Sequence, residues 1–440
     1  MPLTTSVDDL YTAASQQVAT AAEDPTSQVI YTGRYIAIFK QDATDAAISE
    51  FKDTHSLNVA SASSFEGQAV SFEDLGAAEV LVFPSVGAAL VSSEAYAAIS
   101  SGSGPAIAEV GIASVPPPAP APDPNSPIAS YEAEFFVFAI DGGSDASSSA
   151  TDAGTTATAT AAAPTYGLDL TGVTQCGWMG NNIKVCILDT GFDLNHPDFA
   201  GRTIVSHSFV GQAVQDGNSH GTHTAGTACG PLDPGAGISR YGIAYAAQMY
   251  IGKVLTDAGT GTTSSILAGI NWALANNCEV VSMSLRTVAP VQTSYTQAGT
   301  KALAQGTILI AAAGNDSQRP GTIAPTGAPA NSPTFMSVAA LDQNLDIAPF
   351  SNGGKVDIAG PGVGIFSSVP SPALHGTKSG TSMATPHVAG IAALWAESDP
   401  ANRGQALWNA LTGAAKPVTL QSSDVGAGMV QAPTSPAVSR

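Results

Sequence analysis

Basic residues are scarce in this chain. Its 440 residues include 15 Lys and Arg against 35 Asp and Glu, which gives a net charge of −20, yet only 11% of the residues are charged. The acidity therefore comes from missing cations and not from acidic runs. Proteins that bind nucleic acids or anionic membrane surfaces need clustered Lys and Arg to meet the phosphates. The composition argues against both classes of partner.

Cysteine is also rare. None of the four cysteines belongs to a C-x-x-C pair, which argues against a zinc ribbon or a thioredoxin-like motif. Cys186 lies in the apolar stretch IKVCILDTG, where it is expected to be a small buried hydrophobic residue. The sequence allows one disulfide without favouring any pairing of the cysteines. It does not decide the redox compartment.

Long apolar runs are missing as well. No run approaches the roughly 20 residues that a membrane-spanning helix needs. The N-terminal stretch MPLTTSVDDLYTAASQQVATAAEDPTS lacks the basic start and apolar core of a secretory signal. The protein is therefore either intracellular, or exported by another route, or its signal is not part of this sequence.

The length and sequence pattern of the chain predict two domains, because 440 residues are more than one hydrophobic core ordinarily holds. The strand-like YIAIFK (35–40) and YEAEFFVFAID (131–141) flank a helical pattern at 42–55, which predicts a small α/β sandwich. The predicted boundaries are a flexible N-terminal segment 1–27, a sandwich domain 28–141 with a Pro-rich insert 115–127, a low-complexity linker 142–164 and a second domain 165–440.

The second domain alternates short apolar runs with helical stretches. Continuous apolar strands, each followed by a helix, predict an α/β fold with a parallel sheet that helices cover on both faces. Active sites in such folds lie at the carboxyl ends of the strands. The predicted strands are Ile183–Leu188, Met249–Leu255, Val280–Leu285 and Thr307–Ala312, and the predicted helices are Ser264–Ala275 and Ala384–Trp395.

A set of chemically matched residues lies at or near these strand ends. Asp189 follows VCIL, Asn315 follows TILIAAAG, and His220 lies in NSHGTHTAGT. Ser382 lies in KSGTSMATPHVAG, at the start of a predicted helix. His220 is the expected general base for Ser382, and Asp189 would orient its imidazole. Asn315 and the Ser382 N–H would stabilise an oxyanion.

These motifs resemble the subtilisin-like serine proteases, whose Asp, His, Ser order is repeated here. The matching stretches are VCILDTGFDLNHPDF, NSHGTHTAGT, AAAGN and GTSMATPHVAG, within residues 165–435. The resemblance implies a serine endopeptidase with a subtilisin-like α/β fold, no cofactor in the chemistry, and Asp189, His220, Ser382 and Asn315 as catalytic residues.

The resemblance also assigns the N-terminal domain and the substrate strands. It implies that residues 28–141 are an inhibitory propeptide whose tail lies in the cleft, with cleavage between about 141 and 165. It implies that Gly259, Thr260 and Gly261, with Ser284, Leu285 and Arg286, bind an extended substrate. Arg286 departs from the glycine usual in the family, so that it either narrows the cleft, turns outward toward an acidic substrate, or extends to solvent.

Three further residues have weaker assignments. His223 and His387 are expected to have structural roles, and H-x-x-H lacks the H-E-x-x-H frame of a zinc protease. Calcium stabilises many members of the family, and Asp198 in NHPDFAG matches a ligand position. The companion loop CGPLDPGAGIS lacks the expected asparagine-rich pattern, so the sequence does not decide whether a structural calcium ion binds.

The function predicted is a serine endopeptidase made as a zymogen and active as a monomer on protein or peptide substrates. Two alternatives stay open. One is an intracellular maturation protease or transpeptidase with a single precursor substrate. The other is a latent peptide-binding protein whose propeptide never leaves. The family resemblance implies extracellular action, which the N-terminus does not support, so the compartment is undecided.

Overall fold

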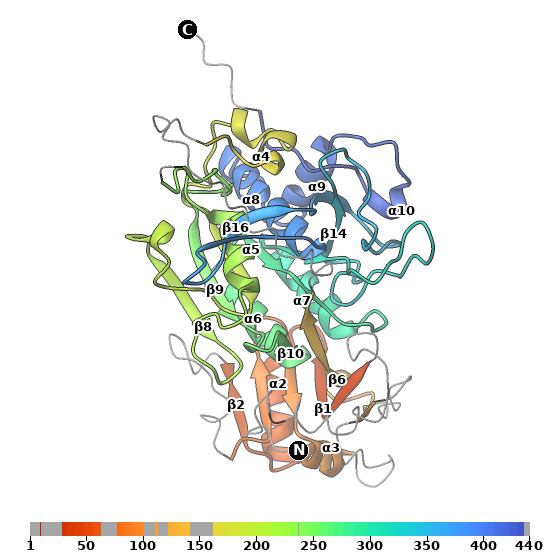
Figure 1. Ribbon diagram of the computed structural model, residues 1–440. Coiled ribbons are helices and arrows are strands. Elements are labelled where there is room, and N and C mark those ends of the chain that lie inside the picture. The colour runs from red at the N-terminus through yellow and green to blue at the C-terminus, as the bar shows by residue number, and fades with distance from the viewer. Residues whose placement is uncertain are drawn as a thin grey trace.

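The computed structural model describes residues 9, 29–62, 77–100, 111–112, 122–140, 162–235 and 237–434. The predicted flexible segment 1–27, most of the linker 142–164 and residues 115–121 of the Pro-rich insert lie outside these residues. The described part forms an N-terminal α/β unit and a larger C-terminal domain, which lie against each other (Figure 1).

The N-terminal unit is built around β1 (Ile30–Phe39), which pairs antiparallel with β4 and β6. The strand predicted at 35–40 thus begins five residues earlier, and the one predicted at 131–141 is β6 (Ile128–Ala139). The helix predicted at 42–55 is α2 (Thr44–Ser49), continued by a π-helical turn at Glu50–Thr54. The remaining elements are β2 (Val59–Ser61), β3 (Val80–Phe83), β4 (Ala88–Val91), α3 (Ser93–Ile99) and β5 (Gly111–Ile112).

Side chains of this N-terminal sheet alternate between two cores. Tyr35, Ala37 and Phe39 point to the face covered by α2 and α3, whereas Ile36 and Ile38 point to the opposite face. Both sets are buried, because that opposite face packs against α6 (Thr263–Ala275) and α7 (Thr293–Ala304) of the C-terminal domain. A sheet that is apolar on both faces needs such a second cover.

The C-terminal domain contains, among the described residues, a seven-stranded parallel sheet in the order β15-β14-β13-β11-β7-β9-β8. This confirms the predicted fold class. All four predicted strands are present, with ends that differ by up to two residues. The bounds are β7 (Lys184–Asp189), β8 (Ile204–Ser208), β9 (Gln248–Lys253), β11 (Val280–Met283), β13 (Ile308–Ala312), β14 (Met336–Leu341) and β15 (Ile358–Pro361).

Helices cover both faces of the parallel sheet. Val185 and Ile187 of β7 pack toward α5 (His220–Cys229) and α8 (Thr381–Ser398), and Cys186 and Leu188 pack toward α6 and α7. The four cysteines are thiols, and Cys186 is fully buried as predicted. The other elements are α4 (Tyr166–Leu170), α9 (Gln405–Ala414), α10 (Ser422–Val425), β16 (Ile365–Ser368), β17 (His375–Lys378) and 3₁₀ turns at Val173–Gln175 and Pro197–Phe199.

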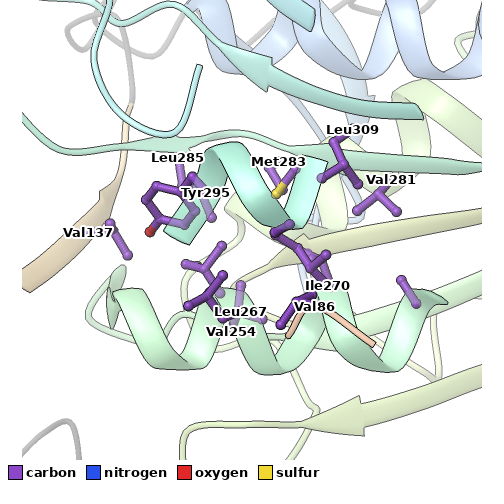
Figure 2. Packing of buried hydrophobic residues seen from close by; sticks show 14 of the residues in the cluster. Val86, Val137, Val254, Leu267, Ile270, Val281, Met283, Leu285, Tyr295 and Leu309 are labelled. Atoms are coloured by element: carbon purple, nitrogen blue, oxygen red, sulfur yellow. The ribbon is translucent and has the colours of Figure 1, made fainter. Parts of the chain in front are cut away.

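One hydrophobic core joins the two units. Figure 2 shows Val86 and Val137 of the N-terminal unit beside Leu267, Ile270 and Tyr295 from the covering helices. The N-terminal sheet also continues into two short strands of the other domain, β10 (Thr260–Thr262) and β12 (Leu285–Arg286), which pair with β6. No helix in the described ranges is long and apolar enough to cross a bilayer.

Candidate active site

The parallel sheet gathers the predicted catalytic residues at one edge. Asp189 is the last residue of β7, and Asn315 follows β13 after a short turn. His220 and Ser382 lie at the first turns of α5 and α8, two helices that pack against each other. Parallel strands end at the same edge of a sheet, and this brings side chains from four distant segments together.

Asp189 and His220 form a buried pair. His220 Nδ1 lies 2.7 Å from Asp189 Oδ1, with side chains that are 0% and 1% exposed. Asp189 Oδ1 also accepts the Thr190 N–H at 2.7 Å, and Oδ2 accepts the Thr224 hydroxyl at 3.1 Å. These donors fix the carboxylate, which holds the proton of the imidazole on Nδ1. The other ring nitrogen is then the one that can take up a proton.

Asp216 holds the start of α5 in place, and the sequence analysis missed it. Its Oδ1 accepts the Ser219 N–H at 2.9 Å, and its Oδ2 accepts the Thr222 N–H at 2.8 Å and the Thr222 hydroxyl at 2.7 Å. Ser219, the residue before His220, has a φ of 85°, a conformation that is unfavourable for a non-glycine residue. Asp216 therefore caps the helix and holds the backbone that presents His220.

Asn315 has an amide that is oriented by Thr381. Asn315 Oδ1 accepts the Thr381 N–H at 2.9 Å and the Thr381 hydroxyl at 2.8 Å. Its Nδ2 is therefore turned the other way, and donates to the carbonyl of Ile140 at 3.2 Å. Thr381, which directly precedes Ser382, was not singled out from the sequence, because its partner lies 66 residues away.

Ser382 faces the same carbonyl. Its Oγ donates to Ile140 O at 2.5 Å, and its side chain is fully buried. Ser382 is the second residue of α8, where backbone N–H groups lack partners within the helix and the helix dipole favours negative charge. A hydroxyl and an amide donor thus converge on one carbonyl oxygen, so the Ile140 carbonyl lies beside both the candidate nucleophile and the candidate oxyanion donor.

The segment that supplies this carbonyl is the end of β6, which lies between β10 and β12. Thr260 and Gly261 pair antiparallel with Phe138 and Val137, and the Ala139 N–H donates to Gly259 O at 2.8 Å. A Cβ at Gly261 would lie only 2.3 Å from Val254 O, so this strand cannot carry a side chain there.

The opposite strand completes the cleft. Leu285 pairs with Ala139 and Arg286 with Phe138, and Ser284 Oγ donates to the backbone carbonyl of Ser382 at 2.8 Å. The predicted substrate residues 259–261 and 284–286 are therefore the two walls around β6. The alternatives in which Arg286 turns outward or extends to solvent are wrong, because its side chain is 3% exposed and pairs with Asp316.

His223 and His387 have other partners than the carbonyl of Ile140. His223 Nε2 is 2.8 Å from Ile365 O, and His387 Nδ1 is 2.8 Å from Met383 O within its own helix. Burial lowers the pKa of His387 to about 4, so it is neutral at pH 7. Both residues therefore have the structural environments that the sequence analysis expected.

Asp198 lies in a network that does not suit calcium. Its Oδ2 accepts hydrogen bonds from the Tyr241 hydroxyl at 2.5 Å and from His375 Nε2 at 2.8 Å. Burial tends to raise the pKa of Asp198, but these two hydrogen bonds hold it below its ordinary value. His196 is also close, with Nδ1 4.0 Å from Oδ1. Calcium takes six to eight oxygen ligands, and imidazole nitrogens are poor donors to it.

A family model described as "Subtilase family" matches residues 180–428. Subtilisin E of Bacillus subtilis (strain 168) is 41% identical over 229 residues, which cover 51% of this chain and 58% of that relative. Subtilisin Savinase of Lederbergia lenta is 39% identical over 258 residues, 58% of this chain and 91% of that relative. This chain thus spans less than two thirds of subtilisin E.

Among solved structures, one described as "Crystal structure of a cold adapted subtilisin-like serine proteinase" is similar to this chain. The two align with a TM-score of 0.53 and 31% sequence identity. The alignment covers 61% of this chain and 97% of the other.

Proposed function

The chain belongs to the subtilase family, and on this premise we propose that it is a serine endopeptidase made as a self-inhibited zymogen. The observation that carries the proposal is the position of Ile140. Its carbonyl oxygen accepts hydrogen bonds from Ser382 Oγ and from Asn315 Nδ2, while β6 is paired on both sides. An extended peptide strand held at a nucleophile has the geometry of a substrate.

Each catalytic residue has a separate role in the proposed reaction. Ser382 Oγ attacks the carbonyl carbon, and its proton passes to His220 Nε2. Asp189 stabilises the imidazolium that forms, through the bond to Nδ1. The carbonyl oxygen becomes negative and is held by Asn315 Nδ2 and by the Ser382 N–H. The C–N bond then breaks, and His220 returns the proton to the leaving amine. Water hydrolyses the serine ester by the same steps, and no cofactor takes part.

From the same geometry we propose the first cleavage site within the chain. The carbonyl held at the catalytic centre belongs to Ile140, so the bond to be broken is the one between Ile140 and Asp141. This lies at the N-terminal limit of the interval expected from the sequence. Asp141 itself lies outside the described residues. After cleavage, the new carboxyl end at Ile140 stays in the cleft as a bound product.

Two acidic residues of β6 support the inhibitory role of the N-terminal unit. Glu132 accepts the N–H groups of Thr293 at 2.6 Å and Ser294 at 3.1 Å, at the first turn of α7. Glu134 accepts the Ser264 N–H at 3.1 Å, at the first turn of α6. Carboxylates at helix N-termini satisfy unpaired donors and interact favourably with the helix dipole. These contacts do not depend on the bond after Ile140, so they persist after cleavage.

Calcium binding at Asp198 is not part of the proposal. The Tyr241 hydroxyl and His375 Nε2 both donate to the carboxylate. We propose that these hydrogen bonds stabilise Asp198 in place of a cation.

A fluorophosphonate probe tests the proposed activity, because it labels only a serine whose hydroxyl is activated. Parent and Ser382→Ala chains would be incubated with the probe and analysed by intact mass, beside a peptide-hydrolysis assay. Labelling of a shortened parent chain, absent from the variant, is the expected result. A folded parent that stays uncut and is never labelled would overturn the proposal in favour of a latent peptide-binding protein. Labelled protein that cleaves a single precursor would instead support a maturation protease.

A further inference from the structure

A partly buried ion pair lies next to the catalytic centre. Arg286, at the end of β12, pairs through its guanidinium with Asp316, the residue that follows Asn315. The side chain of Arg286 is 3% exposed and that of Asp316 is 26% exposed. Asn352 Nδ2 donates to Asp316 Oδ2 at 2.9 Å, and its Oδ1 accepts the Asp316 N–H at 2.8 Å. The carboxylate is therefore fixed in position, and it fixes the guanidinium.

The stem of Arg286 fills the space between two glycines. A Cβ at Gly314 would lie 3.1 Å from Arg286 Cδ, and one at Gly327 would lie 3.1 Å from the same atom and 3.4 Å from Arg286 Cβ. Gly314 directly precedes Asn315, the donor to the reacting carbonyl. The arginine stem thus occupies space immediately beside the residue that holds Ile140.

A cavity adjoins the ion pair. It has a volume of about 780 Å³ and is lined by Arg286 and Asp316 together with mainly apolar residues, among them Val288, Val291 and Pro325. In the described part of β6 and its end, neither Phe138 nor Ala139 nor Ile140 belongs to its lining. The backbone of Arg286 nevertheless pairs with Phe138. The ion pair thus lines this cavity, and Arg286 also pairs through its backbone with the bound peptide.

We propose that the Arg286–Asp316 ion pair is the end wall of the pocket for the residue that precedes the scissile bond, and restricts it to compact aliphatic side chains. This inference rests on the proposed endopeptidase function. The chain's own residue at that position is Ile140, which is 5% exposed. An aromatic side chain would need the space that the arginine stem fills. A charged side chain would lose its hydration and meet a pair whose charges already compensate each other.

Replacing Arg286 and replacing Asp316 are expected to change the substrate profile in different ways. Arg286→Gly joins the pocket to the cavity and leaves the Asp316 carboxylate facing it. Its kcat/KM for peptides with Phe or Lys before the scissile bond is expected to rise tenfold or more, relative to Ile. Adding Asp316→Asn should keep the gain for Phe and abolish the gain for Lys. Asp316→Asn alone retains the shape and leaves the positive charge uncompensated, so the relative kcat/KM for Glu should rise.

The matched control is Arg319→Met. Arg319 forms an ion pair with Asp424 at 2.7 Å, with side chains that are 9% and 15% exposed, and it does not line the cavity. Its substrate profile should equal that of the parent. All variants are titrated with the fluorophosphonate, so that rates refer to active enzyme.

Profiles of Arg286→Gly and Asp316→Asn that equal the parent profile, in labelled enzyme, would overturn the inference and leave the proposed function intact. A parent that is neither cut nor labelled would overturn the proposed function itself. If Arg286→Gly does not fold, Asp316→Asn decides alone, because it preserves volume: a gain for Glu supports the wall, and an unchanged profile refutes it.

Discussion

Arg34 and Glu134 form a fully buried ion pair in the N-terminal unit, and replacing Arg34 with Met is expected to destabilise this unit in a pH-dependent way. Arg34 Nε lies 2.6 Å from Glu134 Oε2, and both side chains are 0% exposed. Glu134 also accepts hydrogen bonds from the Thr32 hydroxyl at 2.6 Å and from the Ser264 N–H at 3.1 Å. Methionine removes the positive charge and leaves these other donors in place.

The size of the effect follows from the two states open to Glu134. Removing one partner from a buried ion pair typically costs about 3–5 kcal/mol. Glu134 avoids part of this by taking up a proton, which for a carboxyl of ordinary pKa 4.5 costs about 3.4 kcal/mol at pH 7. The same protonation costs about 0.7 kcal/mol at pH 5. We therefore expect a loss of about 3 kcal/mol at pH 7 that shrinks by 2 to 3 kcal/mol at pH 5.

Native-state hydrogen exchange of β1 and β6 measures this loss, because it reports the opening of this unit separately from the rest of the chain. Arg34→Met and its parent are compared in a Ser382→Ala background at pH 7 and pH 5, with the exchange rates corrected for their intrinsic pH dependence. The control is Lys40→Met, since Lys40 is a surface cation just after β1 that donates to Pro124 O at 2.6 Å. A loss of equal size at both pH values, or one no larger than the control, would refute the reasoning.

Three further predictions concern other parts of the molecule. Thr381→Val removes the hydroxyl that orients the amide of Asn315, so kcat should fall about five- to tenfold for the roughly 1 kcal/mol of one hydrogen bond. KM should be unchanged in Thr381→Val, and Thr381→Ser should have the kcat of the parent. An unchanged kcat in Thr381→Val would contradict the orienting role of the hydroxyl. The difference in Tm between Asp198→Asn and the parent should be the same in calcium and in chelator, and a difference that appears only in calcium would show a bound ion. In the parent, burial tends to raise the pKa of Glu134, but the charge of Arg34 and its hydrogen bonds hold it below 4.5. This contribution to stability is full above pH 4.5 and is lost as the pH falls through the folded-state pKa. Release of the cleaved N-terminal unit, followed by the recovery of peptide hydrolysis, should therefore accelerate only below pH 4.5. Faster release between pH 7 and 5 would argue against this role of Glu134.

The parallel sheet could be predicted because its strands are continuous apolar runs. Ile183–Leu188 and Thr307–Ala312 have no polar face, which an exposed sheet would require. The same runs end in Asp189 and lead into Asn315, so the strand ends pointed to the candidate site. The tail in the cleft was expected from YEAEFFVFAID and the family resemblance, but its register was not. The register depends on pairing with β12, a strand of two residues that has no recognisable pattern of its own.

Two residues that were not predicted from the sequence, Thr381 and Tyr241, act through partners that are distant in the sequence. Thr381 holds Asn315 across 66 positions, and the hydrogen bond from the Tyr241 hydroxyl to Asp198 spans 43. Three alternatives for Arg286 stayed open for the same reason, because its partner Asp316 comes from another strand end. Side-chain pairing of this kind is set by the tertiary arrangement of strand ends, which neither periodicity nor local motifs encode.

The central claim is that Ser382 acts on the carbonyl of Ile140, and the mass of the N-terminal fragment tests it most directly. Freshly purified parent and Ser382→Ala chains would be denatured in acid and their intact masses measured, with N-terminal sequencing of the larger product. The parent is predicted to give a fragment that ends at Ile140 and a product that begins at Asp141, while Ser382→Ala stays uncut. A parent that is cut at another bond, or a Ser382→Ala chain that is cut equally after Ile140, would contradict the account.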